Sequence, residues 1–257
     1  MTESTREYDV LLEILTNRMS VRRFKPDPVP DDHIERILEA GRWAMSGANS
    51  QPWEFIVVKD PETRQRLYQA YRDINSEYIF WMEQMRVPEM RHPSYQIPGE
   101  VAQQLEQASQ RKGWGDAPVL ICVVGDGRKQ WGTVMGAMTF GRDMTHLTDG
   151  LANASQNMQL AAAALGLGAQ WVTIHVQEPF KRILGVPDLL TFYLIIPIGY
   201  PAVERRPGYR RELRELVHNN KYDMNKYLSN ADAIEYIRQL RQRTLPKYAS
   251  SYRAARP

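Results

Sequence analysis

Four short runs rich in Val, Ile and aromatic residues constrain the fold of this chain most strongly. They span residues 54–58, 118–124, 170–176 and 192–198, and each is bounded by Pro, Gly or Asp. Runs of this length and composition between turn residues are typical of β-strands. The sequence therefore predicts four strands of one sheet. Their alternation with helical stretches would by itself suggest that the strands are parallel.

Helical patterns fill most of the chain between these runs. Asp31 and Asp32 precede Ile34 and Ile37, as at the start of an amphipathic helix. The stretch 151–165 is rich in Ala and nearly uncharged, which predicts a helix that is buried on most of its surface. The predicted helices cover residues 8–17, 31–43, 61–90, 99–111 and 133–165, with an amphipathic one near 231–242.

Composition limits the partners that the chain is expected to have. Of its 257 residues, 33 are basic and 30 acidic, intermingled along the chain with a net charge of +3. Such mixed charge does not predict binding to nucleic acid or to an anionic membrane. Cys122 is the only cysteine and lies in an apolar run, so we expect a small buried hydrophobic residue without a disulfide partner.

The sequence also carries no pattern for export or membrane insertion. The stretch MTESTREYDV lacks the basic and apolar regions of a secretory signal. No apolar run approaches the roughly 20 residues that a membrane-spanning helix needs. We therefore expect a cytoplasmic protein in a reducing compartment.

Several common catalytic motifs do not occur in the sequence. The glycines at 125–132 do not have the spacing of the dinucleotide fingerprint G-x-G-x-x-G, and no Walker A run is found. None of the five histidines forms an i, i+4 pair and there is no C-x-x-C, so we expect no metal site. Ser46-Gly47 lacks the upstream glycine of the hydrolase motif G-x-S-x-G.

Residues 18–24 carry two cations and a hydroxyl at alternate positions. In an extended segment, the side chains of Arg18, Ser20 and Arg22 project to one side. This set suits a cluster of phosphate oxygens or the polar edge of a flavin. The same alternation also fits an ordinary solvated strand face.

A second candidate element lies between residues 44 and 58. A helix ends in a loop of small and amide side chains, from Ser46 to Gln51, which leads directly into a hydrophobic strand. Backbone amides left accessible by the small residues, together with Ser and Asn side chains, would suit a planar heterocycle. A plain turn would have the same composition.

These two elements, in this order, resemble the nitroreductase family. The pattern R-x-S-x-R-x-F is followed about 25 residues later by S-G-A-N-S-Q-P-W-x-F-x-V-V. The resemblance covers roughly residues 12–217 and continues through GLGAQWVT at 166–173, FKRILGVP at 180–187 and PIGYP at 197–201. It implies an α+β fold with a central, mostly antiparallel sheet flanked by helices. It also implies an intertwined homodimer with two FMN sites at the interface.

The resemblance assigns residues to this cofactor. One subunit would hold the phosphate and the pyrimidine side of FMN through Arg18, Ser20 and Arg22. The other subunit would line the flavin through Ser46, Gly47 and Asn49. Residues 1–217 would form the FMN-binding domain, and 218–257 a C-terminal extension that packs on the partner subunit.

Two further groups follow from the same motifs. Trp171, Val172 and Thr173 would lie along the flavin ring, with a backbone N–H near flavin N5. Trp171 stands where smaller residues are common in the family, so it would either reshape the pocket floor or pack in the dimer core. Arg210 falls where the family has a phosphate-binding basic residue, with Arg211 as a near alternative.

Residues 71–112 depart from the classical nitroreductases. Their layout is closer to the flavin-dependent deiodinase branch, in which a Glu, an aromatic residue and a cation clamp an amino-acid zwitterion. Glu77, Trp81 and Arg111 lie near the corresponding positions and are candidate substrate residues. The aromatic-rich composition fits a lid or insertion over the site, and equally an ordinary helical hairpin.

The resemblance predicts an FMN-dependent NAD(P)H oxidoreductase that needs no protein nucleophile. NADH or NADPH would deliver hydride to flavin N5, leave, and be replaced by an electron-poor aromatic, quinone or related acceptor, in ping-pong order. The first alternative is a reductive dehalogenase or another specialised reductase on the same scaffold. The second is a flavin-binding carrier or regulator. The sequence does not distinguish NADH from NADPH.

Overall fold

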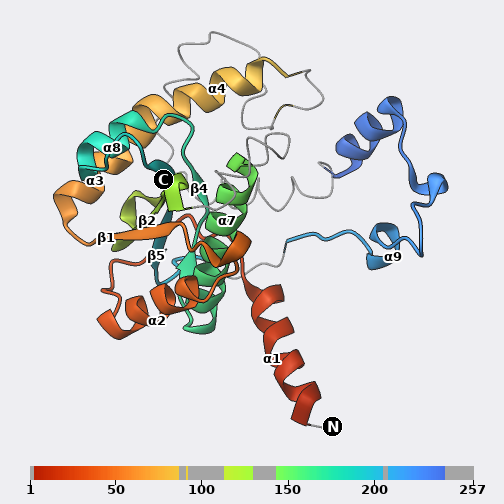
Figure 1. Cartoon of the computed structure of the whole chain (residues 1–257), viewed down its shortest axis with the longest axis horizontal. Helices are drawn as coiled ribbons and strands as arrows, with labels where there is room; N and C mark the ends of the chain where they lie inside the picture. Colours follow the sequence, from red (N-terminus) through yellow and green to blue (C-terminus); the bar gives the residue numbers. More distant parts are fainter. Residues whose placement is uncertain (1–2, 87–90, 92–112, 130–142, 205–207, 241–257) are drawn as a thin grey trace. The chain divides into compact units, whose positions relative to one another are not determined.

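A computed structural model describes residues 3–86, 91, 113–129, 143–204 and 208–240 of the chain (Figure 1). The chain divides into two compact units. The first comprises residues 1–78 and 107–207, and the second comprises residues 79–106 and 208–257. The sheet belongs to the first unit, and each unit is described by itself below.

The sheet is built of antiparallel strand pairs. β1 (Trp53–Val58), β2 (Val119–Gly125) and β5 (Thr191–Gly199) are neighbours in that order. Two short strands, β3 (Gly168–Ala169) and β4 (Val172–Thr173), also pair with β5. The α+β fold with a mostly antiparallel sheet is therefore confirmed, and the parallel arrangement that strand order alone suggested is wrong.

Helices cover both faces of the sheet, so β2 is buried over its whole length. On one face, Val119, Ile121 and Val123 pack with α7 (Asp143–Ala164) and α2 (Asp31–Arg42). On the other face, Leu120 and Cys122 pack with residues of α3 (Pro61–Ala70) and α8 (Glu178–Leu184). Cys122 is fully buried, as predicted, and burial raises the pKa of its thiol.

Helix α7 is the largest contributor to the first of these two core layers. Its buried side chains recur every three or four residues, at Leu147, Leu151, Ala154 and Met158, so the predicted helix is present and buries one broad face. Burying a leucine side chain contributes roughly 1.5–3 kcal/mol. Close packing against α2 requires a glycine, since a Cβ at Gly41 would lie 2.8 Å from Cγ of Met158.

The predicted helix at 61–90 is interrupted. α3 begins at the cap residue Asp60, whose side chain accepts from the Thr63 amide at 2.7 Å. A π-helical turn, η2 (Tyr71–Asn75), separates α3 from α4 (Ser76–Gln84). α4 ends at Gln84, and residues 87–90 of the predicted helix lie outside the described residues. The predicted helix at 99–111 lies outside the described residues, as does the 133–142 part of the helix predicted at 133–165.

The predicted strand at 170–176 is wrong over most of its length. It is replaced by β3 and β4, with Gln170 and Trp171 between them. Beyond Thr173 the backbone leaves β5 because its polar groups bond to a side chain instead, that of Asn75. The other three predicted strands agree with β1, β2 and β5 to within one residue at each end.

The two ends of the described chain are helical. α1 (Glu3–Asn17) starts earlier than predicted and extends away from the rest of its unit (Figure 1). In the second unit, a short helix α9 (Leu213–Leu216) is followed by a helical stretch at 230–240. No helix among the described residues is long and apolar enough to cross a membrane.

Candidate functional site

Backbone hydrogen bonds attach the 18–24 segment to the edge of the sheet. Ser20 forms a parallel bridge with Ala169 of β3, and Phe24 an antiparallel bridge with Pro201. The amide of Val21 donates to the carbonyl of Ala169 at 2.9 Å. From Ser20 to Phe24 the segment therefore lies along the edge of the sheet, whereas the Arg18 amide still donates to the Ile14 carbonyl of α1 at 3.0 Å.

The side chains of this segment divide between core and solvent without strict alternation, since Arg22 and Arg23 are both exposed. Val21 and Phe24 are buried, whereas Ser20 and Arg22 are exposed and Arg18 is half-buried. The arrangement places the two guanidinium groups and the hydroxyl on the side of the strand away from the core. They can therefore meet an anion without a buried charge being left unpaired.

Two features show how tightly this edge is packed. A Cβ added to Gly168 would lie 2.6 Å from Cγ2 of Val21, so only glycine allows the segment to approach β3 this closely. A small pocket beside Arg18, lined also by Met19 and Gln159, has a volume of about 10 Å³. That is room for about one water molecule. This edge thus offers a surface, and not an enclosed cavity, to a larger ligand.

The loop from Ser46 to Gln51, called the 46–51 loop below, has a strained backbone. Ala48, Asn49 and Gln51 have φ values of 51°, 52° and 46°. The left-handed conformation costs a residue with a Cβ roughly 1–2 kcal/mol, less for Asn. Such strain persists only where the surroundings hold it, and it is often found at functional sites.

Hydrogen bonds inside the loop hold this conformation. The Asn49 amide donates to the Ser46 carbonyl at 3.1 Å, and the Ser50 amide to the Gly47 carbonyl at 3.1 Å. The Gln51 amide donates to Oγ of Ser46 at 3.0 Å. The expectation that small residues leave the loop amides accessible is therefore wrong for these three. The Ser46 hydroxyl, which keeps its own proton to donate, and the exposed Asn49 side chain remain candidates.

Helix α7 packs against the 46–51 loop and bonds to the residue that precedes it. A Cβ on Gly150 would lie 3.4 Å from Cβ of Ser46, and Nδ2 of Asn153 donates to the Met45 carbonyl at 3.2 Å. One turn further, Nδ2 of Asn157 donates to the Ala40 carbonyl at 3.1 Å. We had not singled out these two asparagines. Their signal is an i, i+4 pair of amides on one face of an otherwise Ala-rich, nearly uncharged helix.

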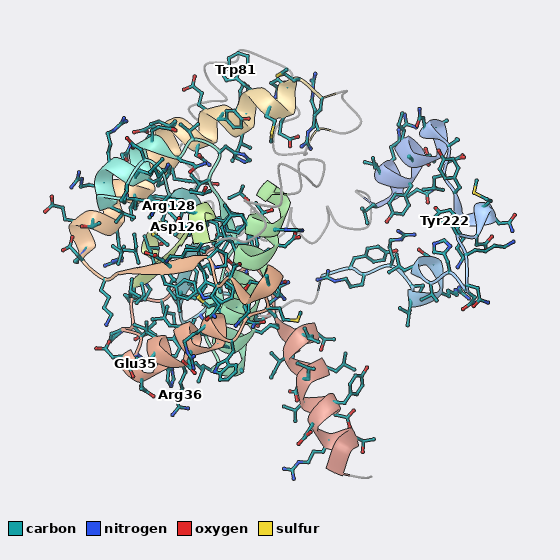
Figure 2. The ribbon with its side chains drawn as sticks, in the orientation of Figure 1. Glu35, Arg36, Trp81, Asp126, Arg128 and Tyr222 are labelled. Atoms are coloured by element: carbon teal, nitrogen blue, oxygen red, sulfur yellow. The ribbon has the colours of Figure 1, made fainter. Side chains whose placement is uncertain are left out.

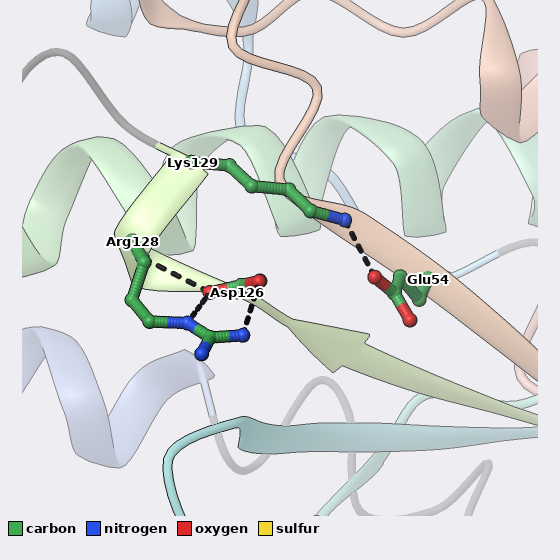
Figure 3. Close-up of polar contacts among 4 residues, drawn as sticks. All are labelled: Glu54, Asp126, Arg128 and Lys129. Carbon is green, nitrogen blue, oxygen red and sulfur yellow. Dashed lines mark hydrogen bonds and ion pairs between the residues drawn. The ribbon is translucent and has the colours of Figure 1, made fainter.

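The far end of the loop is fixed at the ends of β1 and β2. The amide of Asp126 donates to the Pro52 carbonyl at 2.8 Å. The carboxylate of Asp126 is held by Nε and Nη2 of Arg128, each at 2.9 Å, and Lys129 pairs with Glu54 of β1 (Figure 3). The guanidinium of Arg128 lowers the pKa of the Asp126 carboxyl. The loop thus joins two well-anchored elements.

The predicted ring-lining residues 171–173 differ in what they expose. Val172 is buried, so only its backbone can face a ligand, whereas Thr173 is exposed. Trp171 is half-buried and packs edge-to-face on Tyr193 of β5, with ring centroids 5.7 Å apart. Burial, and next the charge of Asp149, raise the pKa of Tyr193. The Trp171 ring therefore rests on the core of its own subunit.

Asn75, which the sequence analysis did not single out, holds the neighbouring backbone. Its side chain donates to the Thr173 carbonyl at 3.0 Å and accepts from the amides of His175 and Val176 at 3.0 and 3.2 Å. Tyr78 stacks on the His175 ring at 5.0 Å, and partial burial lowers the pKa of that imidazole. The local sequence has no signal for these contacts, since the partners lie about 100 positions apart.

The two basic candidates near residue 210 have different surroundings within the second unit. Nη1 of Arg210 donates to the carbonyl of the preceding Tyr209 at 2.9 Å. Arg211 pairs with Glu215 at 3.3 Å, and its guanidinium lies 5.3 Å from the ring centroid of Tyr236. Arg211 is therefore engaged by other side chains, while Arg210 is exposed and makes a local backbone contact.

The candidate substrate residues are only partly described. Glu77 and Trp81 are four positions apart on α4, and both are exposed (Figure 2 labels Trp81). This spacing places them on one face of the helix. Trp81 also packs edge-to-face on Phe80, with ring centroids 5.4 Å apart. Arg111 lies outside the described residues.

Two buried polar atoms beside these elements have no hydrogen-bond partner within the described residues. They are Oγ of Ser50, in the 46–51 loop, and Oε1 of Gln170, between β3 and β4. A buried polar group left without a partner costs about 1–3 kcal/mol. A ligand with donor and acceptor groups, such as the flavin pyrimidine, fits such a surrounding. No group of metal-ligating side chains occurs in this described part of the chain.

The α+β fold thus carries two elements suited to a planar, anionic cofactor. One is the sheet edge with its two guanidinium groups, and the other is the strained loop with its hydroxyl and amide groups. A model described as "Nitroreductase family" matches residues 15–200. The chain therefore belongs to the nitroreductase family. Membership in this family makes it an FMN-dependent oxidoreductase.

The known proteins that resemble the chain agree with this assignment. It is 28% identical over 216 residues to an NADH dehydrogenase of Thermus thermophilus, covering 78% of this chain and 91% of the relative. It is 26% identical over 193 residues to iodotyrosine deiodinase 1 of Rattus norvegicus, covering 74% of this chain and 61% of that protein. An FMN-dependent nitroreductase from Clostridium difficile has the same fold, with a TM-score of 0.56 at 22% identity over 82% of this chain and 99% of the other.

Proposed function

We propose that the protein oxidises NADH or NADPH and reduces an electron-poor aromatic, quinone or related acceptor. The observation that carries the proposal is the attachment of the 18–24 segment to the sheet edge beside residues 170–173. FMN, when bound, supplies the hydride chemistry at flavin N5. Donor and acceptor use one site in turn, which gives ping-pong kinetics.

The chain's own residues bind and orient the cofactor. Arg18, Ser20 and Arg22 hold the phosphate and the pyrimidine side, and their positive charge stabilises the negative charge that develops on reduction. The backbone of Trp171, Val172 and Thr173 lies along the ring. The two unpartnered atoms at Ser50 and Gln170 support this assignment, because each lies in a segment that the motifs assign to the cofactor.

The site is completed by a second copy of the chain, which contributes Ser46, Gly47 and Asn49. The pocket beside Arg18 agrees with this, because its volume of about 10 Å³ is far smaller than a flavin. Exposed apolar side chains on the first unit support a homodimer: Tyr8 and Val10 on α1 are 61% and 51% exposed, and Trp43 after α2 is 72% exposed. Such a surface is costly to leave in water.

The assignment of the remaining phosphate contact favours Arg210. Arg211 would have to give up its ion pair with Glu215 and its contact with Tyr236 before binding a phosphate. We further propose that residues 1–217 form the FMN-binding domain, with an insertion at 71–112. Residues 218–257 would pack on the partner subunit, supported by exposed Tyr222 (labelled in Figure 2), Met224 and Tyr227.

Purification tests the proposal directly. The protein should carry or take up one FMN per chain, with a flavin absorption band that NADH or NADPH bleaches within seconds. Light scattering should give a dimer, and Leu11→Glu with Leu15→Glu, on exposed positions of α1, should yield a monomer with weak FMN affinity. Protein without a flavin band that cannot be reconstituted with FMN would refute the proposal. Slow bleaching by both nucleotides would favour a flavin carrier or regulator.

A reductive dehalogenase is the second candidate, and one observation favours it. Glu77 and Trp81 share a face of α4, and with Arg111 they would clamp an amino-acid zwitterion. Turnover of nitroaromatics and quinones is compared with that of halogenated phenols, without oxygen. Faster turnover of halogenated phenols would replace the first candidate with the second. We also propose a cytoplasmic location, which cell fractionation with a tagged chain would check.

A further inference from the structure

Asn75 is a fully buried amide that bonds only to backbone in the contacts described above. It closes the π-helical turn η2 and is 0% exposed. Its Nδ2 donates to the Thr173 carbonyl, and its Oδ1 accepts from the amides of His175 and Val176, over distances of 3.0 to 3.2 Å. A buried amide with this many bonds fixes the groups that it meets.

The orientation of this side chain is set by its partners. Two backbone N–H groups point at one atom and one carbonyl at the other, so the amide oxygen must face His175 and Val176. The reversed orientation would bring donors against donors. The amide therefore holds four consecutive residues, from Thr173 to Val176, in one arrangement.

This arrangement determines where the strand ends. β4 pairs with β5 only at Val172 and Thr173, and the next peptide groups turn to Asn75. Since the Val172 side chain is buried, backbone position is what this residue can offer a ring. The orientation of the Thr173 peptide group is thus set by the Asn75 side chain, which lies outside the sheet.

A second contact links the same two parts of the chain. Tyr78, one turn after Asn75, stacks on the His175 ring with an interplanar angle of 28°. Both side chains are partly exposed, so the stack is a weaker link than the buried amide. The helix that carries Glu77 is therefore attached to the 172–176 segment at two points.

We propose that Asn75 is a positioning residue of the flavin site. It sets the position of the 172–176 backbone against the flavin ring and connects that backbone to the start of α4. The inference rests on the proposed function, because it takes 171–173 as the ring-lining segment. Asn75 itself touches neither cofactor nor substrate.

Hydrogen exchange in the FMN-free protein tests the positioning without any activity. Asn75→Leu removes all three bonds, so exchange at His175 and Val176 should accelerate about tenfold or more relative to the wild type. Asn75→Asp keeps an acceptor for these two amides and loses the donor to Thr173. It should therefore keep most of the protection against exchange at His175 and Val176. If Asn75→Leu does not fold, Asn75→Asp decides whether the Asn75 side chain positions this backbone.

FMN binding tests the link to the cofactor. Asn75→Leu should weaken FMN binding about tenfold, and Asn75→Asp should fall between it and the wild type. Asp60→Ala is the matched control: it removes the cap of α3 and destabilises the same helical region, but Asp60 bonds to Thr63 and not to the 172–176 segment. It should bind FMN like the wild type.

The outcomes separate this inference from the proposed function. If Asn75→Leu, or Asn75→Asp in its place, binds FMN as tightly as Asp60→Ala, Asn75 is merely structural and the inference is overturned. Unchanged exchange at His175 and Val176 overturns it as well. If the wild type itself does not bind FMN, the proposed function fails, and so does the role of Asn75 in FMN binding. The exchange result still decides whether Asn75 positions the backbone.

Discussion

The 18–24 segment and the 46–51 loop carry the two clearest cofactor motifs, and they reach their conformations in opposite ways. The 18–24 segment is extended and is held by bridges to Ala169 and Pro201, with no residue in a left-handed conformation. In the 46–51 loop three non-glycine residues have positive φ, and the backbone bonds to itself. One segment is shaped by the sheet, and the other is shaped by local strain that α7 supports.

This difference predicts how each element responds to change. An extended strand presents its alternate side chains whatever their identity, so substitutions at Arg18, Ser20 or Arg22 should alter binding without altering the fold. The loop stores strain in its backbone, so substitutions there should alter stability. Four substitutions test the contrast, from the largest expected effect to the smallest.

Arg22→Ala should weaken FMN binding by about 30- to 100-fold, because a charge-assisted hydrogen bond to phosphate is worth roughly 2–3 kcal/mol. Stability should stay within about 0.5 kcal/mol, since the side chain is exposed. Fluorescence titration with FMN and urea unfolding measure the two effects. Arg23→Ala is the control, because Arg23 is an exposed neighbouring cation that the motif does not assign to FMN, and equal weakening by both would contradict the assignment.

Gly168→Ala should destabilise the chain by about 2 kcal/mol, because the new Cβ would lie within 2.9 Å of three Val21 side-chain atoms. The 18–24 segment would have to move off β3. Thermal unfolding measures the loss, and a second substitution, Val21→Ala, should recover part of it. An additive double variant would show that the two residues do not contact.

Ala48→Gly should stabilise the chain by roughly 0.5 kcal/mol, since glycine adopts φ near 51° without strain but loses more entropy on folding. Gly185→Ala is the opposite control, because Gly185 has φ 67° and open space around it. It should destabilise by about 1 kcal/mol. Urea midpoints measure both. A loss of stability in Ala48→Gly would refute the idea that the loop is strained.

Asp126→Asn should have the smallest effect, and one that depends on pH. The folded state lowers the pKa of this carboxyl, so its ionised form stabilises the fold above the ordinary value of about 3.9, and this stabilisation is lost as pH falls below it. The variant should unfold at a slightly lower urea concentration at pH 7 and equal the wild type in strong acid. An equal difference between variant and wild type at pH 7 and in strong acid would contradict this prediction.

Local patterns predicted most of the fold. Three of the four strands were correct within one residue, and the start of α2 and the buried face of α7 agreed with their sequence signals. These elements are set by apolar periodicity and by turn residues, which act over a few positions. The antiparallel topology was available only from the resemblance to a family.

The errors arise where backbone polar groups form hydrogen bonds that the apolar pattern of the sequence does not show. The strand predicted at 170–176 stops at Thr173 because Asn75 binds the next peptide groups. The helix predicted at 61–90 contains the π-turn that places Asn75 there. The loop amides expected to be accessible are bonded inside the 46–51 loop.

The sequence by itself determined the family, the cofactor class and the order of the elements, because these depend on short motifs and on side-chain chemistry that the chain shows directly. Tertiary structure decided which atoms of the motif residues are available: the side chains of Arg22 and Asn49, and only the backbone of Val172. It also decided the contacts of Asn75, whose hydrogen-bond partners lie 98 to 101 positions away in the sequence. Bonds over such separations leave no local pattern, since only the folded chain brings their atoms together.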